Sequence, residues 1–301
     1  PLHQAMIIEA AQDPVFYNDD TTIKILSLEM KSSEDSKERR GLFTTGIVSE
    51  NADRRIYLFF TGARHAGENL DRVLDHRKPE LPPPIQMCDA LSRNWPKRHK
   101  TLRSVCLLHG RRNFVDIFDN FPQECTHLVE SLGAIYKNEA YVRERKMDPL
   151  GRLNYHRRHS QNIMDQLQKW MQDQLDQKQV EPNSGLGKAY KYMLKRWDAL
   201  TLFLREPAAP LDNNTCERGL KMAILHRKNS LFYRTQAGAD VGDLYMSFIH
   251  TCRHNRINPL DYFEQLHRNA QSVQKEPERW MPWNYRRTLE QMGLPSLPVA
   301  A

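Results

Sequence analysis

The sequence lacks the features that mark membrane and secreted proteins. None of its apolar runs approaches the roughly 18 residues that a membrane-spanning helix needs, and its first residues do not form a signal-peptide pattern. Cysteine is scarce, and its five copies are odd in number and scattered along the chain. This usage argues against a disulfide scaffold and predicts a reducing compartment, the cytoplasm.

Residues with metal-ligand spacing are equally sparse. The chain offers only Cys106-x-x-His109 and Cys125-x-His127, whereas a structural zinc site needs four ligands at closed spacing. We therefore interpret the cysteines as buried apolar residues. The first residue is Pro1 rather than Met, so we expect that further residues precede it in the natural protein.

What is present is a basic chain with enough apolar residues for a core. Hydrophobic residues make up 40% of the 301 residues, which argues against general disorder. The 44 Lys and Arg outnumber the 37 Asp and Glu, and 44 − 37 gives a net charge of +7. This positive charge favours polyanionic partners.

Short β-branched and aromatic runs dominate the first part of the chain. After a short helix over residues 2–12, they predict the element order β-β-β-α-β-β-α, with a charged loop over 31–40. The predicted strands are Val15–Asn18 running into Asp19-Asp20-Thr21, Gly41–Val48, Arg54–Thr61, Ile85–Cys88 and Ser104–Leu108, and the predicted helices are Ala66–Arg77 and Arg111–Phe121.

From residue 123 to 205 the pattern changes to helices. Apolar side chains recur there at helical spacing, and we interpret these stripes as core. After a proline-rich break we predict helices over 211–226, 241–255 and 259–266, and an extended segment over 227–233. The Pro-rich tail over 280–301 predicts a segment that wraps the surface or is partly loose.

Three acids suggest a metal-dependent nuclease site. Asp19 and Asp89 each end a predicted strand, and Glu217 lies near the start of a predicted helix. Nucleases that use two divalent ions hold them with carboxylates from separate elements, and Mg²⁺ prefers oxygen ligands. Each acid also has a structural interpretation: Asp19 as a turn residue, Asp89 as a strand-end cap, and Glu217 as the partner of an Asn214 N-cap. Asp19 and Asp20 would point to opposite faces of a strand, so at most one of them reaches a shared metal.

Several segments resemble the IS66 group of bacterial insertion-sequence transposases. The most specific is Asp212-Asn-Asn-Thr-Cys-Glu-Arg218 followed by Arg227-Lys-Asn-Ser-Leu-Phe232, which is similar to the group's D-N-N-x-x-E-R…R-K-N-x-x-F signature. Tyr17–Leu26, Cys106–Phe114 and Met281–Asn284 resemble three further motifs, in the same order along the chain.

This resemblance implies an α/β fold, namely an RNase-H-like mixed five-stranded sheet flanked by helices, with an all-helical insertion before the last catalytic helix. It also implies a D-D-E triad of Asp19, Asp89 and Glu217, both catalytic and metal-ligating, with Asp20 left open as the alternative to Asp19. The implied domains are the first part of the core at 1–122, the helical insertion at 123–206, the last core helices at 207–270 and a C-terminal tail at 271–301.

The function that the resemblance implies is that of a DNA transposase that cleaves and transfers strands with Mg²⁺, or with Mn²⁺ as an alternative. The implied partners are DNA at the element ends and the target, further copies of the chain on DNA, and accessory proteins of the same element, but no membrane. We expect a bacterial, cytoplasmic, nucleoid-associated protein. Two other functions stay open: a catalytically inactive transposase-derived DNA-binding or assembly protein, and an RNase-H-like nuclease.

Two basic stretches, each of which begins just after a proposed ligand, predict contacts to DNA phosphates. Neither residues 93–112 nor residues 218–234 contain an acid, and such groups position the DNA backbone without reading bases. A solvated basic face is the alternative interpretation. His109, Asn213 and Asn214 are candidates for a supporting role, the two asparagines also as helix caps. The candidate DNA-binding residues are Arg93, Lys97, Arg98, Arg111, Arg112, Arg218, Arg227 and Lys228.

Overall fold

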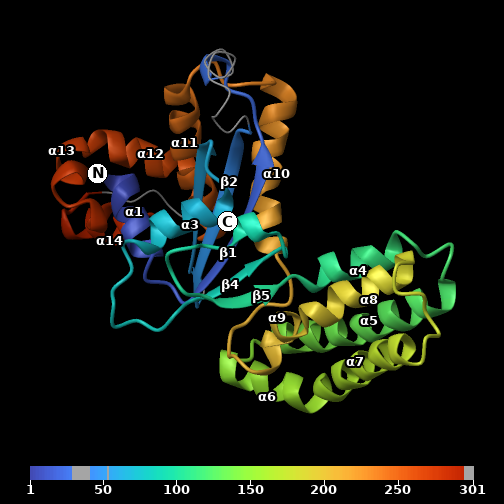
Figure 1. The fold of residues 1–301 in the computed structure, drawn as a ribbon. Coiled ribbons are helices and arrows are strands. Elements are labelled where there is room, and N and C mark those ends of the chain that lie inside the picture. The colour runs from blue at the N-terminus through green and yellow to red at the C-terminus, as the bar shows by residue number, and fades with distance from the viewer. Residues whose placement is uncertain (29–40, 53, 295–301) are drawn as a thin grey trace. The chain divides into compact units, whose positions relative to one another are not determined.

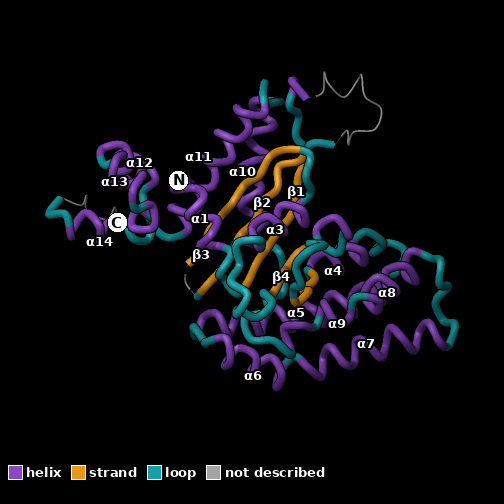
Figure 2. The backbone as a smooth tube through the Cα atoms, turned by 60° about the vertical axis from the view of Figure 1, so that its left-hand side comes forward, coloured by secondary structure: helices purple, strands orange, loops and turns teal. Residues whose placement is uncertain are grey.

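The described strands form one mixed sheet of five strands. The computed structural model describes residues 1–28, 41–52 and 54–294, so the predicted loop over 31–40 lies outside the described residues. The strand order is β3-β2-β1-β4-β5 (Figures 1 and 2). The α/β class and the predicted order β-β-β-α-β-β-α are both confirmed. The strands are β1 (Val15–Thr22), β2 (Phe43–Asn51), β3 (Arg54–Gly62), β4 (Ile85–Cys88) and β5 (Leu102–Val105).

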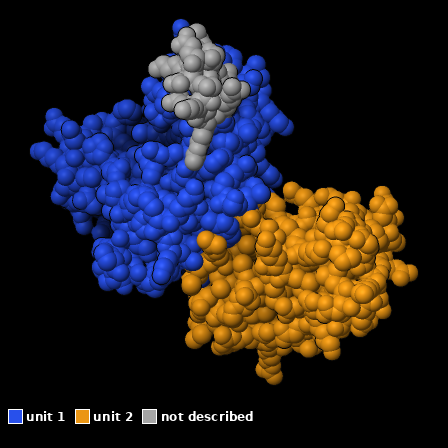
Figure 3. All heavy atoms as spheres, in the orientation of Figure 1, with its two compact units in different colours: residues 1–86, 91–101, 214–301 blue, residues 87–90, 102–213 orange. Residues whose placement is uncertain are grey.

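The chain divides into two compact units, which Figure 3 colours separately. Unit 1 comprises residues 1–86, 91–101 and the chain from 214 onward, and unit 2 comprises residues 87–90 and 102–213. Unit 2 thus holds the predicted helical insertion together with β5 and the helix after it. The predicted domain boundaries at 122 and 206 stay a prediction.

Strands β1, β2 and β3 pair antiparallel in unit 1. Their register places Asp19 opposite Gly46, and Gly46 opposite Phe59. Residues directly opposite each other share a face of the sheet, and successive residues alternate between faces. The strand was predicted to end at Asp19, but β1 continues to Thr22, so Asp19 and Asp20 both lie inside it.

One face of this sheet carries the main core of unit 1. Helices α1 (Leu2–Ala10) and α3 (Ala66–Leu74) contribute to an apolar cluster with Phe16, Ile47 and Leu58 of the strands. These three strand residues belong to the same alternating set as Asp20, so Asp20 lies on this face. We call it the α3 face.

The opposite face carries α10 (Asn214–Ser230). Cys216, Gly219, Leu220 and Ala223 are the buried residues of this helix. A methyl group on Gly46 would lie 3.0 Å from Leu220 Cγ and 3.4 Å from Cys216 Sγ. The bare backbone at Gly46 therefore lets α10 lie close to β2, and Asp19 shares this face. We call it the α10 face.

Helix α11 (Gln236–His254) covers the free edge of β3. Its side chains at Asp243, Ser247 and Thr251 accept hydrogen bonds from alternate backbone N–H groups of β3, at Thr61, Phe59 and Tyr57. Four helical residues rise about 6 Å and two strand residues about 6.8 Å, so the two ladders stay in step. The helix thereby pairs an edge that would otherwise be open to another strand.

The C-terminal segment is folded onto unit 1 as far as the structure describes it. Trp280 is wholly buried and Leu289 nearly so, both within the apolar cluster of the α3 face. The prediction of a loose or merely surface-wrapping tail was therefore wrong for 280–294, because its aromatic residues supply core. The helices here are α12 (Pro259–Arg268), α13 (Ala270–Lys275), η3 (Pro277–Trp280) and α14 (Tyr285–Gln291).

Unit 2 is built mainly from helices. The predicted core stripes are confirmed in part, since Leu167, Met171, Tyr190 and Met193 are buried. All five cysteines of the chain are free and buried, as interpreted from the sequence. The helices are α4 (Leu107–Val115), α5 (Pro122–Glu144), α6 (Pro149–His159), α7 (Gln161–Asp176), α8 (Gly185–Lys195), α9 (Trp197–Leu200) and η2 (Leu202–Leu204).

The predictions were wrong at two places where one element meets the next. The strand predicted to end at Leu108 ends at Val105, and the helix predicted from Arg111 begins at Leu107. The extended segment predicted from Arg227 is instead the last turn of α10, which continues to Ser230. At both places the residues on either side of the junction suit a helix as well as a strand, so the pattern did not show where one element ends. Among the described residues, η1 (Ser92–Asn94) is the short turn in which the first basic stretch, residues 93–112, begins.

Candidate active site

The two adjacent acids of β1 lie in different surroundings. Asp20 is on the α3 face, and its side chain is 1% exposed. Its Oδ2 lies 3.0 Å from His65 Nδ1, and its Oδ1 lies 3.4 Å from a guanidinium nitrogen of Arg93. The Ala66 N–H, in the first turn of α3, also points to Oδ2 at 3.4 Å. Asp20 therefore contacts cationic and hydrogen-bonding groups that suit a structural carboxylate.

On the α10 face of unit 1, the start of α10 lies against Gly46, the residue that pairs with Asp19. Cys216 is buried between β2 and α10, and its thiol donates to the Gly46 carbonyl at 3.3 Å. Burial raises the pKa of this thiol well above its usual value, and the negative charges of Asp19 and Glu217 raise it further. The same sulfur also bonds to the Asp19 backbone. The charges of Asp19 and Glu217, which are far apart in the sequence, thus both raise the pKa of the Cys216 thiol.

The residues that make this approach possible were not predicted from the sequence. Gly46 leaves space for α10, and a methyl group on Gly219 would lie 2.9 Å from Tyr57 Cε1, so both glycines allow helix and sheet to meet closely. Cys216, adjacent to Glu217, fills the space between them. A glycine within a β-rich run was the available signal, because glycine weakens a strand unless another backbone or helix comes close.

A buried polar network lies beside Asp19. Gln86 of β4 donates from its Nε2 to Asn18 Oδ1 and to the Asn94 carbonyl, both at 2.8 Å. Asn18 Nδ2 donates to the same carbonyl at 2.8 Å, and Asn94 Nδ2 lies 3.5 Å from Asp19 Oδ1. The network ties η1 to β1 and β4. The sequence feature that could have indicated this network is the presence of Asn18 and Gln86 within otherwise apolar runs, because buried polar side chains need hydrogen-bond partners.

Asp89 follows β4 directly and belongs to unit 2. β4 is the neighbour of β1 in the sheet order. Within unit 2, Asp89 lies near Tyr192 of α8: burial raises the pKa of the Tyr192 phenol, Arg196 opposes this effect, and the charge of Asp89 adds to it. The Cys88 thiol donates to the Asp89 carbonyl at 2.9 Å. The prediction that Asp89 joins the other two acids stays a prediction.

The first basic stretch is held in place by one carboxylate of α3. Asp71 accepts hydrogen bonds from the backbone N–H groups of Lys97, Arg98 and His99 at 2.8–3.1 Å. Burial alone would raise the pKa of Asp71, but these bonds, together with the His99 side chain, outweigh it and lower the pKa. The Lys97 side chain is exposed, while Arg98 pairs with Asp75 at 2.8 Å. The loop is thus fixed with its cations outward.

The second basic stretch lies along α10. Arg227 is a structural clamp, because its guanidinium bonds to the Thr21 hydroxyl at 3.1 Å and to the carbonyl and hydroxyl of Thr22 at the end of β1. Arg218 and Lys228 are exposed. Burial lowers the pKa of His254, and the charges of Arg55 and Arg218 lower it further, so cationic groups gather near the start of α10.

The remaining candidates lie on α4 and at the start of α10. In unit 2, His109, Arg111 and Arg112 lie on α4, with Arg112 exposed. Asn213 is buried, and its N–H points to Cys106 Sγ at 3.4 Å. α10 begins at Asn214, so Asn213 directly precedes the helix, and the division between the two units falls between these asparagines.

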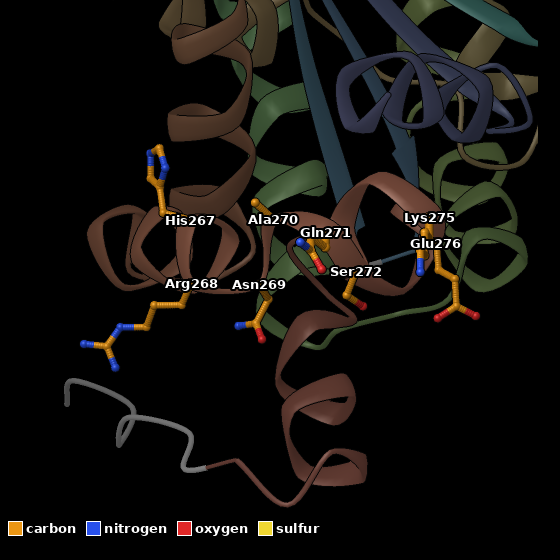
Figure 4. A pocket seen from close by; sticks show the side chains of 8 residues that line it. All are labelled: His267, Arg268, Asn269, Ala270, Gln271, Ser272, Lys275 and Glu276. Carbon is orange, nitrogen blue, oxygen red and sulfur yellow. The ribbon is translucent and has the colours of Figure 1, made fainter.

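A polar pocket near the C-terminus is separate from these residues. It measures about 780 Å³ and is lined by His267–Ser272, Lys275 and Glu276. Its labelled side chains fan out in different directions rather than toward a common centre (Figure 4). None of the predicted site residues lines it. Among the described residues, no helix has the length and apolarity to cross a membrane.

Comparison with known proteins gives one family and several relatives. The family described as "Transposase IS66 family" matches residues 1–241. The uncharacterized protein y4jD of Sinorhizobium fredii (strain NBRC 101917 / NGR234) is 28% identical over 61% of this chain and 36% of its own length. The uncharacterized protein y4qI of the same strain is 30% identical over 60% of this chain and 33% of its own length. The chain therefore spans about a third of the length of these curated relatives.

Proposed function

Because the chain belongs to the IS66 transposase family, we propose that it is a catalytic region that cleaves DNA at the end of a mobile element and joins the freed 3′-hydroxyl to target DNA. The observation that carries this proposal is that Cys216, which precedes Glu217, lies against Gly46, the residue opposite Asp19, on the α10 face. Gathering carboxylates is electrostatically unfavourable unless a cation compensates them. A third acid, Asp89, follows the strand beside β1.

The chemistry of these donors fits Mg²⁺. Asp19 and Glu217 offer carboxylate oxygens, which are the ligands that this small, hard cation prefers. The proposed ligands are therefore Asp19, Asp89 and Glu217, with Mn²⁺ as a substitute. When bound, two such ions activate the attacking water or 3′-hydroxyl and stabilise charge on the leaving oxygen.

The chain's own residues contribute binding and positioning. The loop fixed by Asp71 presents Lys97 outward, and α10 presents Arg218 and Lys228, so each would hold DNA through its phosphates. The network of Asn18, Gln86 and Asn94 fixes the backbone around Asp19. Positioning of this kind supplies much of the rate in phosphoryl transfer, because little covalent chemistry falls to the protein.

The proposal is tested with DNA that carries the element end, in Mg²⁺, using a chain that includes any upstream residues. We expect Glu217→Gln and Asp89→Asn each to lower cleavage and strand transfer at least ~100-fold while DNA binding persists. Asp240→Asn is the matched control, because Asp240 is an exposed acid of α11 in the same unit as Glu217. It should retain activity.

Each alternative function has its own outcome in this assay. Cleavage without joining of 3′-ends would identify an RNase-H-like nuclease. Salt-dependent DNA binding with no metal effect and no cleavage would identify an inactive DNA-binding or assembly protein. Undiminished joining by the Glu217→Gln variant would contradict the proposed ligand set.

A further inference from the structure

The turn that follows α10 exposes two adjacent large apolar side chains. Leu231 is 64% exposed and Phe232 is 42% exposed. Met222 and Leu225, on the preceding turns of the helix, are exposed as well. Scattered apolar residues on a surface need no explanation, but a contiguous group of them marks a binding surface. Phe232 is the last residue of the R-K-N-x-x-F motif, but the proposed function assigns no role to it or to the other three residues.

The backbone of this turn is strained. Leu231 has φ +64°, which is uncommon for a residue with a bulky side chain. The Phe232 N–H donates to the Ser230 carbonyl at 2.8 Å, so Leu231 is the central residue of a γ-turn of the rare, strained form. Glycine would adopt this conformation without strain. Strain of this kind is retained where the resulting side-chain placement serves a function.

The residue after the pair fixes the turn to the end of β1. The Tyr233 N–H donates to the Lys24 carbonyl at 2.9 Å, and the Tyr233 carbonyl accepts from the Leu26 N–H at 3.0 Å. The Tyr233 ring stacks on His226 at 5.1 Å. A methyl group on Gly242 would lie 2.5 Å from the Tyr233 hydroxyl, so this glycine makes room for the ring. The backbone next to Leu231 and Phe232 is therefore held in place by these contacts of Tyr233.

The charges around the pair favour nucleic acid over another protein surface. No acid lies between Glu217 and Asp240, and Lys221, Lys228 and Arg234 are all exposed in this stretch. Such a field attracts phosphates and would repel a second copy of the same basic surface. Apolar side chains flanked by cations match the arrangement with which proteins unstack bases while they hold the backbone.

We propose that Leu231 and Phe232 form an apolar wedge that stacks on an unpaired or distorted base of the DNA whose phosphates Lys221, Lys228 and Arg234 hold. This inference rests on the proposed function, because it takes DNA as the ligand. It assigns to the turn after α10 the recognition of DNA distortion, which backbone contacts alone do not provide.

The test measures DNA binding without catalytic metal. The probe is a duplex with a short single-stranded overhang that carries 2-aminopurine, whose fluorescence reports base stacking, and affinity is measured by anisotropy. Phe232→Ala should weaken binding roughly 5- to 100-fold, the range of base–aromatic stacking, and abolish the fluorescence response. Its salt dependence should not change, because the phosphate contacts remain. Lys228→Gln should instead reduce the salt slope by about one and keep the fluorescence response.

Two further variants separate the wedge from folding effects. Leu231→Gly relieves the backbone strain, so it should raise the melting temperature and still weaken the fluorescence response. Leu260→Ala is the matched control, because Leu260 is 74% exposed on α12, outside the basic stretch. It should bind the probe like the wild type.

The outcomes distinguish this inference from the proposed function. A wild-type fluorescence response in Phe232→Ala would overturn the wedge, even if DNA cleavage by the wild type is intact. Loss of self-association in Phe232→Ala, with unchanged DNA binding, would overturn it in favour of an interface between copies. A wild type that binds the probe through Phe232 but never cleaves DNA would support the wedge and contradict the catalytic proposal.

Discussion

On the two faces of the sheet in unit 1, the neighbouring acids Asp19 and Asp20 have opposite electrostatic surroundings. On the α3 face, Asp20 is enclosed by His65, Arg93 and the start of α3. On the α10 face, Asp19 lies with Glu217 near one buried thiol. One carboxylate contacts the Arg93 guanidinium and the His65 imidazole, whereas the other lies near the same thiol as a second carboxylate. A single step along a strand can therefore separate a structural acid from a candidate metal ligand.

The largest expected effect concerns the core of the α3 face. Trp280→Ala removes a wholly buried side chain from the apolar cluster and should lower the free energy of unfolding by about 3–5 kcal/mol. Chemical denaturation measures this loss. If the two faces have separate roles, the folded variant should still bind Mn²⁺ like the wild type. The control is Met292→Ala, an exposed residue of the same segment, whose stability should change by less than about 0.5 kcal/mol.

Asp243 is a buried acid that belongs to neither of these two faces, and its ionisation makes the stability of the protein depend on pH. Burial raises the pKa of Asp243 to about 7, although hydrogen bonds from Thr61 favour its charged form. The folded state therefore keeps a proton that the unfolded chain, with a pKa of 3.8, releases. The stability that this proton confers is complete below about pH 4 and is lost as the pH rises through 7, with an upper bound of roughly 4 kcal/mol.

Unfolding titrations between pH 4 and pH 8 measure this dependence. In Asp243→Asn the fall in stability over that range should be much smaller, because the amide does not titrate and still accepts from Thr61. A variant whose stability falls as steeply as that of the wild type would show that Asp243 is already ionised in the folded state.

The close contact between α10 and β2 is tested by adding one methyl group at Gly46. Gly46→Ala places a carbon 3.0 Å from Leu220 Cγ, so it should destabilise the protein by about 1–3 kcal/mol and displace α10 from β2. It should therefore also weaken Mn²⁺ binding, which calorimetry measures. Gly133→Ala in α5 is the opposite control: nothing lies within 4 Å of the added methyl group, and the change should stabilise by up to about 1 kcal/mol. Equal effects of both changes would contradict the close contact at Gly46.

The smallest stability effect is expected at Asp20. Asp20→Asn removes one charge from contacts with the partly exposed His65 and Arg93, so thermal unfolding should show a loss of about 1 kcal/mol. Its Mn²⁺ affinity should stay close to that of the wild type. A loss of Mn²⁺ binding in this variant would reverse the assignment of the two neighbouring acids.

Local sequence patterns predicted a strand well where the run of residues was compatible with a strand but not with a helix. The run Ile85–Cys88 was predicted to the residue, because Pro84 precedes it and Asp89 follows it. β1 extends through Asp19 and Asp20, which rarely favour strands, because pairing with β2 continues there. Leu107 and Leu108 continue an apolar run, so nothing in the residue pattern marks the start of a helix within it.

Long-range partners could not be predicted in this way. The network that joins Asn18, Gln86 and Asn94 depends on contacts between segments far apart in the sequence. The same holds for Gly46 and Cys216, which meet only because α10 lies on β2. The periodicity of α11 indicated a helix, but not that Asp243, Ser247 and Thr251 would pair the edge of β3.

The most direct test of the central proposal is to locate Mn²⁺ by anomalous scattering in crystals of the protein. The proposal predicts one or two ions coordinated by carboxylate oxygens of Asp19, Asp89 and Glu217, at distances of about 2.0–2.3 Å, with Asp20 still bound to His65. Ions held only at other groups, with Asp89 more than about 10 Å from Asp19 and Glu217 and thus beyond the reach of a two-metal site, would contradict it.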